Sequence, residues 1–173
     1  QYGGYAKLGY EISQAWNVRA DVNVTHFNAS QPGTVTNPMA DADQRITRGM
    51  TSLSVENNYG RTSGALSLFY NWGRHRINDG YTVDPNDTNN PKDYRFNSRD
   101  DMMGVSWYQS ARLFRGNRLT VGADYYRFGG EAWNRYVEGD RKGERSDIAD
   151  KSQDEVAGYV DFRQDIGGWL TFD

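Results

Sequence analysis

Two long amphipathic segments joined by a tight turn constrain this chain more than any other feature. Between Met102 and Phe128, apolar residues alternate with small or polar residues on both sides of the turn Arg115–Asn117. Side chains of a strand point alternately to the two faces of its sheet, so each segment has one apolar and one polar face. Both segments exceed the roughly five or six residues of a typical soluble strand. The apolar face carries Met103, Val105, Trp107, Ala111, Leu113, Leu119, Val121, Ala123 and Tyr125.

The rest of the chain repeats this hairpin. Alternating segments predict further strands over residues 3–13, 18–28, 45–59, 64–77, 154–163 and 169–173. Short turns at residues 14–17, 60–63, 115–117 and 165–168 alternate with long connections at residues 29–44, 78–97 and 130–153. All four prolines lie in the long connections, because a proline inside a strand would interrupt the backbone ladder. Transmembrane β-barrels have this rhythm of short periplasmic turns and longer extracellular loops.

The composition excludes several classes of protein. Hydrophobic residues make up 36% of the chain and the mean hydropathy is -0.89, with no apolar run near the roughly 18 residues of a membrane-spanning helix. Aromatic residues, at 14%, are too abundant for a disordered chain. A net charge of -3 argues against a protein that neutralises nucleic-acid phosphates. Since cysteine is absent, a disulfide scaffold and thiol catalysis are excluded.

The predicted strands favour part of a barrel larger than this chain. The last segment, residues 169–173, is shorter than the roughly nine to eleven residues that a membrane-spanning strand needs. An open sheet edge is not tolerated in the bilayer core. We therefore expect an all-β fold in which residues 1–173 form about seven to eight strands of a single, larger, antiparallel up-and-down transmembrane β-barrel domain. A soluble β-sheet is the main structural alternative.

Aromatic residues near the strand ends fit this placement. Trp16 and Tyr59 lie beside short turns, whereas Tyr70 and Trp72 lie at the opposite end of their strand. Tryptophan and tyrosine form girdles at both membrane interfaces in transmembrane barrels. The positions predict two such girdles.

At this level of detail the chain resembles the barrel of TonB-dependent outer-membrane receptors, particularly those of Bacteroidetes. The resemblance is carried by strand texture over nearly the whole chain, in GGYAKLGYEISQAWNVRADVNVTHFNAS, RITRGMTSLSVENNYGRTSGALSLFYNWG, RGNRLTVGADYYRFGGEAWN and EVAGYVDFRQDIGGWLTFD. It implies a barrel of about 22 strands in the bacterial cell outer membrane. A plug domain and a TonB box would lie outside this chain.

The resemblance also implies a function and partners. Such receptors capture a scarce ligand and import it with energy from the TonB–ExbB–ExbD complex. A siderophore, haem or cobalamin-type chelate is favoured over a glycan. Expected partners are the plug domain, outer-membrane lipid and lipopolysaccharide, and a surface lipoprotein. We expect no enzymatic activity, no resident cofactor and no nucleic-acid partner.

Two sets of residues are candidates for ligand or plug contact. Aromatic side chains give rigid contact surfaces, and loops on a rigid scaffold commonly carry function. The loop-end aromatic set comprises Tyr81, Tyr94, Phe96, Trp133 and Tyr136. The set predicted to face the barrel lumen or plug comprises Arg19, Asp21, Arg48, Glu56, Tyr108, Arg112 and Asp124.

No metal site is predicted. His26 and His75 are the only histidines, and we favour a solvated or lumen position for both over axial ligation of haem. The loop Asp84–Asn89 resembles the start of a calcium loop, but Arg95 stands where an EF-hand needs its bidentate glutamate. The mixed charges of residues 138–150 fit a solvated outer surface, whose lysines and arginines can also bind lipopolysaccharide phosphates.

Two other functions stay open. One is a small passive outer-membrane barrel or a surface-binding protein. The other is an outer-membrane barrel enzyme, which needs a serine, a histidine and a carboxylate at one membrane depth. Neither histidine has an evident set of such partners in the sequence.

Overall fold

The computed structural model describes residues 1–36, 38–82 and 93–173. Within these residues the chain forms one antiparallel sheet of eight strands in the order β1-β2-β4-β5-β7-β8-β9-β10. Its strands are β1 (Tyr2–Ser13), β2 (Trp16–Ser30), β4 (Asp43–Asn58), β5 (Thr62–Asn78), β7 (Tyr94–Ala111), β8 (Asn117–Tyr136), β9 (Arg145–Ile166) and β10 (Leu170–Phe172). The two-residue strands β3 (Met39–Ala40) and β6 (Tyr81–Thr82) pair with each other. None of the described segments is a helix with the length and hydropathy to cross a membrane.

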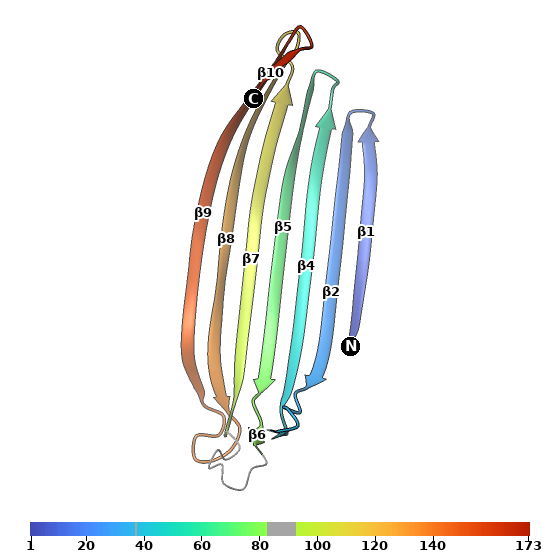
Figure 1. Cartoon of the computed structure of the whole chain (residues 1–173). Helices are drawn as coiled ribbons and strands as arrows, with labels where there is room; N and C mark the ends of the chain where they lie inside the picture. Colours follow the sequence, from blue (N-terminus) through green and yellow to red (C-terminus); the bar gives the residue numbers. More distant parts are fainter. Residues whose placement is uncertain (37, 83–92) are drawn as a thin grey trace.

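The alternation of short and long connections is confirmed. Each long strand pairs with the next long strand along the chain, so the sheet is an up-and-down meander. The four short turns gather at one end of the strands, and the long connections gather at the other (Figure 1). Glycines with positive φ close three of the short turns, for example Gly60 at 78° and Gly116 at 75°. Only glycine adopts this backbone conformation without steric cost.

The third long connection was predicted too long. Strand β8 continues to Tyr136 and β9 begins at Arg145, so the connection spans only residues 137–144 rather than 130–153. The added ladder pairs Gly130 with Lys151 and Arg135 with Arg145. Apart from Trp133, Tyr136 and Ile148, its residues are charged, polar or small, so no regular hydrophobic alternation marks them in the sequence. Backbone pairing with a neighbouring strand holds them in the sheet instead.

This sheet is a single layer without a protein core. In the described part of the chain, each strand contacts only its sheet neighbours, and Ala42 is the one buried hydrophobic residue. Large apolar side chains are instead exposed along the whole sheet, for example Leu8 at 74%, Leu68 at 40% and Val156 at 82%. A sheet normally buries its apolar face against a second layer. This one presents its apolar face to the surroundings.

The pairing register gathers these apolar residues on one face. Directly paired residues of antiparallel strands share a face. One complete row across seven strands consists of Leu8, Ala20, Leu53, Leu68, Val105, Tyr125 and Val156. We call this side of the sheet the apolar face and the other side the polar face. The predicted separation of the two faces is therefore confirmed.

One residue is added to the apolar face, and one predicted position is corrected. Gln109 belongs to the apolar face, between Trp107 and Ala111. Its amide is satisfied there, because it exchanges two 3.2 Å hydrogen bonds with the amide of Asn57 and donates a third to Thr62. Arg112 follows the last residue of β7 and lies in the short turn rather than on a strand.

The apolar belt crosses the strands obliquely. The row of paired residues that contains Val22 is uncharged from β2 to β7, where Met103 belongs to it. In β8 and β9 the same row holds the charged residues Arg127 and Asp154. In β7–β9 the belt instead reaches the row nearest the short turns, through Ala111, Leu119 and Phe162. From β1 to β9 the belt thus shifts toward the short turns. Such an offset is expected where strands are tilted relative to a flat apolar layer.

Glycines on the polar face make room for aromatic rings of the paired strands. Figure 1 shows β7 between β5 and β8. At the centre of β7, Gly104 pairs with Phe69 on one side and Tyr126 on the other, and their ring centroids lie 5.8 Å apart. A Cβ atom at Gly104 would lie 2.4 Å from Phe69 Cε1 and 2.6 Å from Tyr126 Cδ1.

We therefore predict that Gly104→Ala lowers the free energy of unfolding by about 1–3 kcal/mol, because both rings must move. Urea unfolding followed by tryptophan fluorescence measures this change. Gly158→Ala is the matched control, since the nearest atom to its Cβ is a carbonyl oxygen at 3.8 Å. Equal destabilisation by both substitutions would show that the rings do not depend on Gly104.

Candidate functional site

Four polar side chains meet on the polar face near the long-loop end. Arg48 on β4 and His75 on β5 face Ser98 and Asp100 on β7. His75 Nδ1 lies 2.9 Å from Ser98 Oγ, and Arg48 Nη2 donates to Asp100 Oδ1 at 3.3 Å. The Asp100 carboxylate lies over Gly73, where a Cβ would come within 2.6 Å of Oδ1. The fold thus builds a hydrogen-bonded network across three neighbouring strands.

This network contains a serine, a histidine and a carboxylate, a combination that no local sequence pattern indicates. A nucleophilic centre needs the carboxylate to orient the imidazole through a close hydrogen bond. Here Asp100 Oδ1 is 3.8 Å from His75 Nε2, and Arg48 Nη2 is closer to the same nitrogen, at 3.4 Å. The Arg48 guanidinium therefore occupies the position from which a carboxylate would orient the His75 imidazole. The geometry supports polar anchoring on this face more than nucleophile activation.

The second histidine lies on the other face. His26 shares the apolar face, and its ring stacks on Tyr2 with centroids 4.8 Å apart. His26 Nδ1 also contacts Thr47 Oγ1 at 2.7 Å. The two histidines are therefore on opposite sides of the sheet. In the described ranges no cluster of three metal-binding side chains is present, and the loop Asp84–Asn89 lies outside them.

The residues predicted to face the lumen or plug share the polar face, except Arg112. Arg19 pairs with Glu56 at 3.2 Å, and Ser52 donates to Asp21 at 2.5 Å. Tyr108, Asp124 and Arg48 follow the same register on the central strands. Arg112 instead lines a hollow beside the short turns, together with Arg118, Arg163 and Asp165.

The loop-end aromatic residues do not form one site. Four of the five lie on strand ends rather than in loops: Tyr94, Phe96, Trp133 and Tyr136. Tyr94 and Tyr136 are direct partners on the polar-face register, with ring centroids 5.8 Å apart, and Phe96 shares their face. Trp133 lies on the opposite face, and Tyr81 lies in β6, paired with Ala40. The contact between Tyr94 and Tyr136 depends on long-range register and gives no local sequence signal.

Glu131 joins two arginines next to Trp133. Its carboxylate pairs with Arg99 at 2.8 Å and Arg145 at 3.1 Å, while its own side chain is only 13% exposed. The Arg145 guanidinium also lies 4.3 Å above the Trp133 ring. Hydrogen bonds to Asp147 and then to Glu131 raise the pKa of Arg145 above its ordinary value. This network fixes the long-loop ends of β7, β8 and β9.

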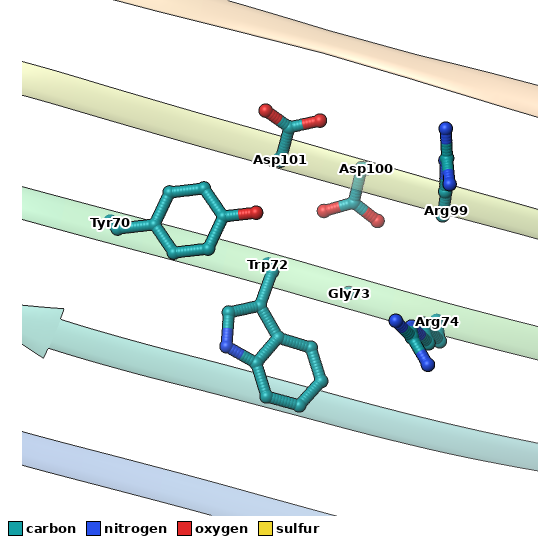
Figure 2. A pocket seen from close by; sticks show the side chains of 7 residues that line it. All are labelled: Tyr70, Trp72, Gly73, Arg74, Arg99, Asp100 and Asp101. Carbon is teal, nitrogen blue, oxygen red and sulfur yellow. The ribbon is translucent and has the colours of Figure 1, made fainter.

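A hollow of about 500 Å³ opens where the apolar belt meets the charged end of the sheet. Figure 2 shows the rings of Tyr70 and Trp72 on one side of it and the guanidinium groups of Arg74 and Arg99 on the other. The Asp101 carboxylate, on the same face, lies between them along β7. Such a site offers aromatic surface and positive charge to an amphipathic molecule.

Comparisons with known proteins assign no family. No protein-family model matches the chain, and no curated protein matches it significantly. Its function must therefore be argued from the residues and their arrangement.

We predict that Glu131→Gln lowers the free energy of unfolding by about 1 kcal/mol, because two guanidinium groups lose a shared and largely buried carboxylate. Urea unfolding measures the effect. The control is Glu144→Gln, which removes the exposed ion pair between Arg141 and Glu144 in the connection from β8 to β9. A smaller effect at residue 131 than at residue 144 would contradict the anchoring role of this network.

Proposed function

We propose that this chain forms part of the barrel wall of a TonB-dependent receptor in the bacterial outer membrane. One observation carries the proposal: a continuous belt of exposed apolar side chains covers one face of a single-layer sheet. Water would make such a belt costly, at roughly 25 cal/mol for each Å² of apolar surface. A lipid bilayer removes this cost without a second protein layer.

The connections and the belt agree with this placement. Short turns at one end and long connections at the other match the periplasmic and extracellular ends of an outer-membrane barrel. The oblique course of the belt fits strands that are tilted by roughly 35–45° to the membrane normal. Both observations favour a membrane barrel over a soluble sheet.

The polar face would then line the lumen. Its network of Arg48, His75, Ser98 and Asp100 lies near the long-loop end, where a ligand would enter. The paired rings of Tyr94 and Tyr136 lie on the same face, closer to the connections. In this arrangement the polar face contacts the plug domain and the incoming ligand, and the barrel itself performs no covalent chemistry.

The proposed ligand class is a siderophore, haem or cobalamin-type chelate, imported with energy from TonB. This choice rests on the resemblance of the strand segments rather than on a particular side chain. The wall residues would hold and guide the ligand, and the plug domain would release it.

Charge placed on either face should distinguish a lipid-facing from a lumen-facing side. Val105→Arg puts a cation in the middle of the apolar belt and should block membrane assembly, at a cost of about 2–4 kcal/mol. Ser106→Arg, on the adjacent residue but the polar face, should assemble normally, since it is paired with Asp124. Heat-modifiable migration on gels and outer-membrane fractionation report assembly. Equal assembly of both variants would rule out a lipid-facing belt.

The transport role is tested with the full-length protein that contains this chain. In a strain lacking the gene, the full-length gene should restore growth on limiting chelated iron or on limiting cobalamin. Growth should be lost again when TonB is deleted. A full-length protein without an upstream plug domain, or uptake that does not need TonB, would overturn the proposal while leaving the membrane placement intact.

A further inference from the structure

Four exposed arginines lie together on the apolar face just beyond the belt. Strands β4, β5 and β7 supply them: Arg45, Arg74, Arg76 and Arg99. The register pairs Arg45 directly with Arg76, and Arg74 directly with Arg99. Like charges in directly opposed positions destabilise a sheet. An anion that lies between two such pairs would offset this repulsion.

The carboxylates of the chain neutralise only half of this arginine cluster. Arg45 pairs with Asp43 at 3.3 Å, and Arg99 pairs with Glu131 at 2.8 Å. In the described residues, Arg74 and Arg76 make no ion pair. The Asp101 carboxylate also lines the hollow of Figure 2, but it forms no ion pair with Arg74 or Arg99. The cluster therefore keeps a net positive charge.

The order of side chains along β5 is that of a membrane interface. On the apolar face, β5 presents Leu66 and Leu68, then Tyr70 and Trp72, and then the two unpaired arginines. Aliphatic residues suit the acyl region, aromatic residues suit the interface, and cations suit the anionic head-group layer. A second hollow, of about 470 Å³, lies between all four arginines and shares Arg74 and Arg99 with the first.

We infer that the arginine cluster binds the phosphates of an anionic glycolipid of the lipid A class in the outer leaflet. This inference rests on the proposed outer-membrane location. Guanidinium groups bind phosphate oxygens through two parallel, charge-assisted hydrogen bonds. The phosphates offset the repulsion between opposed arginines, the sugar lies against Tyr70 and Trp72, and the acyl chains follow the belt below.

The test uses the full-length protein that contains this chain, purified in detergent and freed of lipid. Purified lipid A is added, and bound lipid is counted and titrated by native mass spectrometry. The double variant Arg74→Gln/Arg76→Gln should bind lipid A at least about tenfold more weakly, because two charge-assisted contacts are lost. The control Arg61→Gln/Arg112→Gln removes two arginines at the short-turn end and should leave binding unchanged.

Competing ligands identify the source of the phosphate. Inorganic pyrophosphate should displace lipid A poorly, and phosphatidylcholine should not bind at the cluster. Equal lipid A binding by wild type and the double variant would overturn the inference, as would full displacement by pyrophosphate. A failure here with normal membrane assembly would leave the proposed function standing, whereas failed assembly of the wild type would overturn both.

Discussion

The backbone hydrogen-bond ladder is the interaction on which this structure depends. No second layer packs on the sheet in the described part of the chain, so strands are joined only to their neighbours. Each added strand satisfies the N–H and C=O groups along one side of the previous one. Strands β1 and β10 pair on one side only. A ladder of this kind tolerates an apolar environment on a face, provided that its backbone groups are paired.

Cross-strand side-chain pairs then decide which face meets which environment. On the polar face, glycines leave room for large side chains of the next strand. Gly122, for example, lies under the ring of Tyr159. Polar groups there find partners on adjacent strands, as Arg19 does with Glu56. In the belt of the apolar face, branched and aromatic side chains continue from strand to strand, and the ion pairs of that face lie beyond the belt. The register therefore turns a local alternation into two extended surfaces of opposite character.

The sequence predicted the meander because period-two alternation and turn residues are local signals. Leu53 and Leu68 could be assigned to one face from their own strands, and pairing then placed them side by side. The extension of β9 to Arg145 was missed, since alternating charged residues resemble a solvated loop. Gln109 was overlooked for a similar reason, because its partner Asn57 is remote in sequence.

The polar network was beyond local prediction. His75 and Ser98 meet because β5 and β7 pair in one particular register across a long connection. A shift of one residue would have placed the serine on the other face. Only the paired backbone fixes that register, so proximity of these groups could not be inferred from spacing. The same limitation hid the meeting of Tyr94 and Tyr136.

The arginine cluster is informative because it places two directly opposed arginine pairs side by side at the edge of the apolar belt. On the polar face Arg48 has a partner of opposite sign in Asp100. At the edge of the belt, Arg74 instead faces Arg99, and Arg76 faces Arg45. Folding alone gives no advantage to such pairs. Under the proposed outer-membrane location, an external anion supplies the missing charge where these two pairs lie together, directly beyond Tyr70 and Trp72.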